Sequence, residues 1–283
     1  MSKSQSYIET QDFSVSGEMF RLCVNPQYGF LETRPQPDLE KLPEYYKSDD
    51  YISHTDSKRN VFESLYHLIR NISLKRKLRL IHSLSKSGNT LLDVGCGTGD
   101  FLKAAQDDKW DVCGVEPNEN ARAIANQKTN QLVFDVEQLS KFDKHQFDVI
   151  TLWHVLEHLP KLEDQIQILK SLLKQNGRLI IAVPNFNSYD ARHYKSFWAA
   201  YDVPRHLWHF NQKSISRLFA SINMEVENVH PMTFDAFYVS LLSEKYKRGW
   251  MNVFSAFCVG LVSNFKARRT GEYSSLIYVI KNN

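Results

Sequence analysis

The sequence contains few cysteines, and they do not form pairs. Its four cysteines are widely separated and no CxxC motif occurs; they are Cys23, Cys96, Cys113 and Cys258. This spacing argues against both a zinc site and a disulfide-stabilised scaffold, and it fits a reducing compartment. We therefore expect a cytoplasmic protein that holds no metal.

Strong net charge and long hydrophobic runs are also lacking. A net charge of +3 over 283 residues is too small to indicate a nucleic-acid partner. The polar N-terminal segment gives no sign of a secretory signal. The apolar run at residues 250–265 is shorter than the roughly 20 residues of a membrane-spanning helix. Its basic flanks leave two interpretations open, a buried or lid helix and weak contact of residues 250–266 with a membrane surface.

Three regions differ in their hydrophobic pattern. Residues 1–57 lack periodicity and are rich in Pro, Ser, Asp and Tyr, which predicts an N-terminal arm of short strands or turns. Residues 58–87 repeat apolar positions every three or four residues, which predicts a helical cap of one or two helices, with Ser73 available as an N-cap at a break. From residue 88 to residue 283, short apolar strands alternate with helices.

The alternating region predicts a doubly wound α/β domain with a parallel sheet buried on both faces. A helix over residues 162–175 is expected to end at the Asn176-Gly177 pair. Two insertions interrupt the pattern, at residues 185–211 and 235–271. Both should leave the sheet as lids on the side where an open α/β fold binds its ligands.

The stretch LLDVGCGTGDF carries the main functional signal. Gly95, Gly97 and Gly99 are spaced GxGxG, and Asp100 stands where the dinucleotide fingerprint GxGxxG needs its third glycine. The Asp93 carboxylate would repel a pyrophosphate but would attract an amine or a sulfonium. S-adenosylmethionine has both cationic groups and no phosphate, so it is the expected cofactor, with S-adenosylhomocysteine as its product.

Acidic residues also end the next two predicted strands. Glu116 ends the second strand, where a carboxylate can accept hydrogen bonds from both ribose hydroxyls. Asp135 ends the third strand and can accept from the adenine amine, with the Val136 N–H bonding a ring nitrogen. Either acid alone would more often be a solvated strand end, but the series behind one glycine loop favours a nucleoside site.

Five segments together resemble the motif series of class I S-adenosylmethionine-dependent methyltransferases: LLDVGCGTGDF, VCGVEPN, FDVEQL, FDVITLWHVLEHLP and LLKQNGRLIIAVPN. Within that group the chain is most similar to the broad branch with an EHL-type fourth motif. The resemblance implies a Rossmann-like, seven-stranded sheet whose last strand is antiparallel. It implies that Asp93 and the three glycines hold the methionine end, Glu116 the ribose and Asp135 the adenine. The expected cofactor contacts also include Cys96, Pro117, Val136 and His154.

The N-terminal arm departs from some related methyltransferases. They carry a cysteine-rich zinc knuckle before a GF and a proline-rich turn. This chain retains YGFLETRPQP but has Cys23 alone, with Asn25 and Tyr28 where a CxxC pair would fall. We therefore expect a degenerate, metal-free knuckle-like region that serves another purpose, such as covering the site.

Histidines near the expected methyl donor are candidates for a general base. His154 and His158 follow the fourth strand, and His206 and His209 lie in the first insertion. His154 and His206 are the favoured catalytic residues, because their segments flank the same crevice. A hydrogen-bonded structural role is the alternative for each, and Glu157 is expected to brace His158 or a helix end.

The first insertion is rich in aromatic residues, which suits either a ligand pocket or a lid with its own small core. The leading hypothesis is a methyltransferase acting on a small-molecule or carrier-linked acceptor, with oxygen as the favoured acceptor atom. Quinone, lipid and glycan acceptors all remain open, as does the oligomeric state. The alternatives are a catalytically silent cofactor-binding module, an NAD-dependent oxidoreductase, which Asp93 argues against, and an RNA methyltransferase, for which no basic aromatic face is evident.

Overall fold

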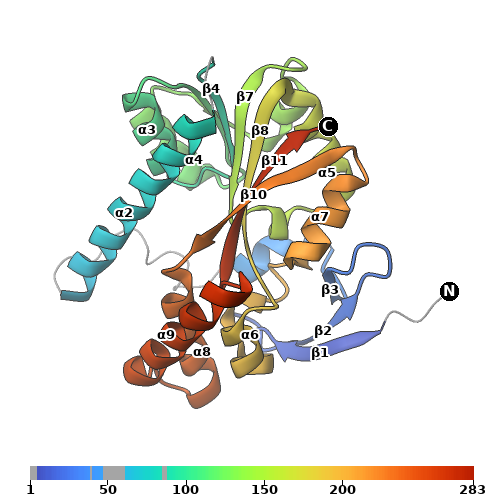
Figure 1. Ribbon diagram of the computed structural model, residues 1–283, viewed down its shortest axis with the longest axis vertical. Helices are drawn as coiled ribbons and strands as arrows, with labels where there is room; N and C mark the ends of the chain where they lie inside the picture. The colour runs from blue at the N-terminus through green and yellow to red at the C-terminus, as the bar shows by residue number, and fades with distance from the viewer. Residues whose placement is uncertain (1–4, 39, 47–60, 85–87) are drawn as a thin grey trace.

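The computed structural model describes residues 5–38, 40–46, 61–84 and 88–283. The rest of the predicted arm and cap lies outside the described residues. The described chain forms a large mixed sheet covered by helices, with a small sheet and a group of helices at one end (Figure 1).

The large sheet has seven strands in the order β10-β11-β8-β7-β4-β5-β6. Pairing is parallel from β8 to β6, whereas β11 runs antiparallel to both of its neighbours, β8 and β10. The predicted seven-stranded Rossmann-like sheet with an antiparallel last strand is therefore confirmed. The strands are β4 (Thr90–Val94), β5 (Asp111–Val115), β6 (Val133–Phe134), β7 (Phe147–Trp153), β8 (Leu173–Pro184), β10 (Met224–Met232) and β11 (Ser275–Asn282).

Helices cover both faces of this sheet, which explains why its strands are almost continuously apolar. One face packs against α2 (Val61–Leu84), α3 (Asp100–Asp107) and α4 (Glu119–Thr129), and the other against α5 (Leu162–Leu172) and α7 (Gln212–Ala220) (Figure 1). Strand order reverses between β4 and β7, so the crevice beyond their carboxyl ends is the expected ligand site.

The arm forms a second sheet with part of the first insertion. Its strands β1 (Ser6–Gln11), β2 (Met19–Val24) and β3 (Leu31–Arg34) form an antiparallel meander, and β9 (Trp208–His209) pairs with β3. The turn where a zinc knuckle would lie is held by Asn25, which accepts from the backbone N–H groups of Gln27 and Tyr28, both at 2.9 Å. Tyr28 stacks on Phe30. These contacts hold the shape of the turn.

Both insertions fold at the carboxyl end of the parallel strands, next to the small sheet (Figure 1). The first contains α6 (Tyr189–Tyr194), two 3-10 turns and β9, and the second contains α8 (Asp235–Arg248) and α9 (Val253–Thr270). Among the described residues, no helix combines the length and the hydropathy that crossing a bilayer requires.

The cap, expected as one or two helices, forms the single helix α2, which continues through Ser73 while Leu74, Leu78 and Ile81 contact the sheet. The end predicted for the helix over residues 162–175 is wrong. Helix α5 ends at Leu172, and residues 176 and 177 already belong to β8. Gly177 is needed there for a close approach rather than for a C-cap, since a Cβ would lie 2.9 Å from the Asp148 carbonyl oxygen.

Candidate functional site

The glycine loop after β4 has one position that is open to a ligand. Gly95, Gly97 and Gly99 all adopt positive φ angles of 68°, 55° and 77°. A Cβ at Gly95 would lie 2.5 Å from Val155, and one at Gly99 would lie 2.8 Å from the Ala125 Cβ. A Cβ at Gly97 would meet nothing within 4 Å. The outer glycines therefore permit close packing, and Gly97 leaves its backbone exposed to a bound molecule.

Asp93 is a buried carboxylate beneath this loop. Its side chain is 2% exposed and accepts a hydrogen bond of 2.6 Å from the Thr151 hydroxyl on β7. Burial raises the pKa of Asp93 to about 7, while the Thr151 hydroxyl and the Lys77 charge act in the opposite direction. A carboxylate held this way gains most from a cationic ligand, which would favour its ionised form.

Lys77 is a functional candidate that sequence reasoning missed. It lies on α2, and its ammonium is 4.2 Å from the centroid of the Trp153 ring, at the end of β7. Burial lowers its pKa to about 8, although the charges of Asp93 and Asp235 favour the protonated form. A lysine in a helical repeat is usually solvated, so no local signal distinguished this one.

Glu116 and Asp135 follow the next two strands, as the sequence predicted, but their environments differ. Glu116 is 8% exposed, and its carboxylate accepts from the N–H groups of Gly97 and Asn118, at 2.8 and 2.9 Å. It therefore lies directly across the glycine loop. Asp135 is half exposed, and its carboxylate pairs with Arg122 at 3.0 Å.

The remaining predicted cofactor contacts lie on the same loops. Val136 is exposed beside Asp135, and Pro117 is exposed after Glu116. Cys96 turns its sulfur toward β5, because a Cβ built at Gly114 would lie 3.0 Å from it. Burial raises the pKa of the Cys96 thiol, so this side chain stays neutral.

His154 stands at the end of β7 in a left-handed conformation, with φ of 58°. Both ring nitrogens face carboxylates, with Nδ1 3.5 Å from Glu157 and Nε2 3.3 Å from Asp235 of α8. Burial favours the neutral ring, but these two carboxylates outweigh it and raise the pKa of His154 to about 10. The ring therefore links the end of β7 to the second insertion, and Asp235 is a further residue that the sequence did not reveal.

Of the other three candidate histidines, His158 and His206 contact each other, and His209 has a structural role. His158 and His206 lie edge to face, with ring centroids 4.6 Å apart. Burial and the charge of His206 lower the pKa of His158 to about 4. His209 is buried, and its Nε2 lies 3.0 Å from the Thr33 hydroxyl of the arm, so it joins β9 to β3.

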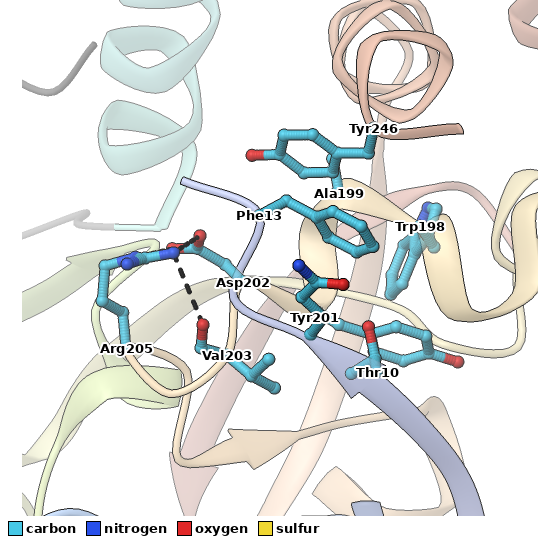
Figure 2. A pocket seen from close by; sticks show the side chains of 10 residues that line it. Thr10, Phe13, Trp198, Ala199, Tyr201, Asp202, Val203, Arg205 and Tyr246 are labelled. Carbon is cyan, nitrogen blue, oxygen red and sulfur yellow. Dashed lines mark hydrogen bonds and ion pairs between the residues drawn. The ribbon is translucent and has the colours of Figure 1, made fainter. Parts of the chain in front are cut away.

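Three large aromatic residues of the first insertion form a core. Tyr194, Trp198 and Tyr201 are each at most 2% exposed. Figure 2 shows the cavity beside them, with Phe13 of the arm next to Tyr246 of α8, and it measures only about 10 Å³. That volume accommodates about one water molecule. The aromatic density therefore belongs to a lid with its own core.

A buried ion pair fixes this lid to the arm. Arg205 is 4% exposed, and its guanidinium lies 2.7 Å from Asp202 (Figure 2). It also lies 3.1 Å from Asp12 of the arm. Arg205 also donates to the carbonyl oxygen of Tyr45, at 2.9 Å. The arm and the first insertion therefore form one packed unit beside the carboxyl ends of the parallel strands.

These features fit a cationic nucleoside without a phosphate. The open backbone at Gly97 gives space, and the buried Asp93 favours positive charge. The Glu116 carboxylate accepts hydrogen bonds from two backbone N–H groups. Sugar hydroxyls of a ligand could donate to it in their place. A pyrophosphate would face two carboxylates in the same crevice, which Coulomb repulsion disfavours.

Comparison with known proteins agrees with this geometry. The model of a family described as "Methyltransferase domain" matches residues 64–229. Ubiquinone biosynthesis O-methyltransferase of Coxiella burnetii is 31% identical over 128 residues, covering 43% of this chain and 53% of that protein. The corresponding protein of Glaesserella parasuis is 32% identical over 129 residues, covering 40% and 55%. The chain thus spans about half the length of the curated relatives it matches.

Solved structures share the fold at low sequence identity. Magnesium protoporphyrin IX methyltransferase from Synechocystis PCC 6803, solved with bound S-adenosylhomocysteine, matches with a TM-score of 0.55 at 15% identity, over 87% of this chain and 100% of that one. An S-adenosylmethionine-dependent methyltransferase from Archaeoglobus fulgidus matches with a TM-score of 0.52 at 16% identity, over 79% and 100%. The family match covers more than half of the chain, which therefore belongs to the methyltransferase domain family, within the class I S-adenosylmethionine-dependent enzymes that its motifs resemble.

Proposed function

We propose that the chain binds S-adenosylmethionine in the crevice beyond β4, β5 and β6. Asp93 and the loop at Gly97 would hold the amine and the sulfonium, Glu116 the ribose hydroxyls, and Asp135 with the Val136 N–H the adenine. The observation that carries this assignment is the buried Asp93 beneath an open glycine backbone. Binding would exchange the present backbone contacts of Glu116 for ribose hydroxyls.

We further propose that the methyl group moves to a hydroxyl oxygen of a small-molecule or carrier-linked acceptor. The relatives described above are named O-methyltransferases, which supports oxygen as the acceptor atom. The acceptor would lie against His154 and the cluster of Glu157, His158 and His206. Val155, which follows His154 in the chain, packs against Gly95. His154 and the cluster therefore lie beside the glycine loop. Orienting the hydroxyl in line with the sulfonium would supply most of the rate enhancement.

An assay of S-adenosylhomocysteine formation tests this proposal. It supplies S-adenosylmethionine as the methyl donor and catechols, hydroquinones and lipid-linked sugars as acceptors. We expect turnover with at least one hydroxyl acceptor and loss of turnover in His154→Asn. The matched control is His193→Gln, which changes an exposed histidine of the same lid. Cofactor binding without turnover on any acceptor class would instead identify a catalytically silent module.

A further inference from the structure

Three side chains near the end of β7 bring potential metal ligands together. Glu157, His158 and His206 each offer one ligand atom, and these atoms all lie within 4.8 Å of one another. Glu157 is 1% exposed and His206 is 9% exposed. Two residues come from the turn after β7 and the third from the first insertion, so folding of the lid completes the group.

Backbone carbonyl oxygens contact Nδ1 of both histidine rings, on the side opposite Nε2. Nδ1 of His158 lies 3.0 Å from the Arg205 carbonyl oxygen, and Nδ1 of His206 lies 2.9 Å from that of Ala200. A carbonyl oxygen can only accept, so a proton on Nδ1 fits each contact and leaves Nε2 as the ring nitrogen available to a ligand. This hydrogen-bond arrangement is the usual one behind metal-ligating histidines. The Tyr46 hydroxyl also lies 3.0 Å from Nδ1 of His158, and Asp202 lies 3.9 Å from Nε2 of His206.

Glu157 lacks a hydrogen-bond donor. Neither carboxylate oxygen has a hydrogen-bond partner among the described residues, and the nearest positively chargeable group is His154 Nδ1, at 3.5 Å. Leaving a buried carboxylate without donors is costly. His154 faces this carboxylate at 3.5 Å without forming a hydrogen bond, so a cation held between Glu157 and the two imidazoles would give both carboxylate oxygens a direct partner.

We propose that Glu157, His158 and His206 bind one divalent transition-metal ion. Two imidazoles and one carboxylate form a three-ligand set that suits first-row divalent metals and leaves coordination positions open. This departs from the metal-free expectation, which considered cysteine patterns and missed ligands 49 residues apart. If the proposed function is correct, on which this part of the inference rests, the ion would act as a Lewis acid on the acceptor hydroxyl.

Zn²⁺ titration of the metal-free chain by calorimetry tests the site without cofactor or acceptor. We expect one Zn²⁺ per chain, and at least tenfold weaker binding in His206→Gln and Glu157→Gln. His193→Gln controls for adventitious histidine binding, and near-ultraviolet circular dichroism verifies that each variant remains folded. Co²⁺ substitution should give visible absorption bands in the wild-type chain and not in His206→Gln.

Absence of stoichiometric Zn²⁺ binding, or equal binding by folded His206→Gln and wild-type chains, would overturn the proposal. Because no methyl transfer is measured, failure of the proposed function would leave this result unaffected. Conversely, an active chain whose turnover is unchanged by chelators and that binds no Zn²⁺ would refute the metal site alone.

A second inference rests on the orientation of α9. Its large apolar side chains face outward, whereas a helix covered by water would turn them toward the core. Its buried side consists of small residues, Ala256, Val259, Gly260, Ser263 and Ala267. Its outer side carries large apolar residues that are 39–80% exposed, namely Val253, Phe254, Phe257, Leu261, Val262 and Phe265. Trp250 and Met251, just before the helix, are 59% and 44% exposed. An apolar face of this length requires a partner.

The charges around this face indicate the partner. Residues 245–271 contain six lysines and arginines, flanked by Glu244 and Glu272; the cations are Lys245, Lys247, Arg248, Lys266, Arg268 and Arg269. Arg248 pairs with Glu244, and Lys266 lies over the Tyr189 ring. They lie at the two ends of the apolar stripe. We propose that this face inserts into the interface of an anionic lipid surface, where basic side chains meet headgroups and aromatic rings reach the acyl boundary. Since α8 begins at Asp235, which contacts His154, the membrane face belongs to the lid beside the site.

Vesicle sedimentation tests this inference, using vesicles of phosphatidylcholine alone and of equal parts phosphatidylcholine and phosphatidylglycerol. We expect binding to the anionic vesicles only, and about tenfold weaker binding for the double variant Phe254→Ser, Phe265→Ser. Met19→Ser is the matched control, because Met19 is 61% exposed on the arm. Equal vesicle binding by the double variant and by Met19→Ser would overturn the inference. A dimer in sedimentation equilibrium that the double variant abolishes would also overturn it, because this face would then contact a second copy.

Discussion

Replacing Asp93 by asparagine should weaken cofactor binding and stabilise the protein at the same time. The carboxylate is buried and hydrogen-bonded to Thr151, and an asparagine of the same shape would still accept that bond. Removing the charge abolishes the attraction for the amine, which is the cationic group that S-adenosylhomocysteine retains. Hydrogen bonds to charged groups are worth about 1.5–3 kcal/mol, so the Kd for S-adenosylhomocysteine should rise roughly 10- to 150-fold.

The effect on stability has the opposite sign. Because the folded-state pKa of Asp93 is about 7 rather than 3.8, the folded chain holds a proton that the unfolded chain has released. Stability therefore falls as pH rises from about 4 to about 7, and at pH 8 the full penalty applies. The pKa difference sets an upper limit of about 4 kcal/mol on the stability that Asp93→Asn should regain at pH 8. Loss of the attraction to Lys77 reduces this gain.

Two assays test this pair of effects. Calorimetric titration at pH 8 and at pH 6 should show wild-type affinity falling at the lower pH, as Asp93 becomes protonated, and little change in Asp93→Asn. Urea denaturation at pH 8 should show a higher midpoint for the variant. A variant that binds S-adenosylhomocysteine as tightly as the wild type, or that is less stable at pH 8, would refute the reasoning.

Three further substitutions probe the site and the lid. Gly97→Ala should lower S-adenosylhomocysteine affinity more than tenfold and stability by about 1 kcal/mol, because its Cβ enters the open space at a φ of 55°; calorimetry and urea denaturation measure both. Glu116→Gln should weaken the same binding about 10- to 100-fold through lost ribose contacts, and unchanged Kd would contradict the assignment. Arg205→Leu removes the cation that Asp12 and Asp202 share and should cost about 3–5 kcal/mol in urea denaturation; a loss below 1 kcal/mol would be inconsistent with this role.

The central sheet was predictable because local patterns determine it. Apolar strands bounded by glycine turns gave the strand sequence, and the acids at the strand ends were visible at Asp93, Glu116 and Asp135. The β3–β9 pairing was not predictable, since it joins an arm of irregular composition to two residues inside an insertion.

The histidines show why a site is harder to predict than a fold. Sequence reasoning selected His154 and His206 individually, but their environments also depend on long-range packing. Asp235 reaches His154 from α8, and Glu157 reaches His206 across 49 residues. Burial was equally invisible, so the aromatic residues of the first insertion were compatible with both a pocket and a core. Their side chains proved to be the core, because the arm and α8 pack around them.

Calorimetric titration of the chain with S-adenosylhomocysteine, with NADH as the control ligand, tests the central claim most directly. The account predicts saturable binding of one S-adenosylhomocysteine per chain and no binding of NADH. Absence of S-adenosylhomocysteine binding by the folded chain, or saturable binding of NADH, would contradict it.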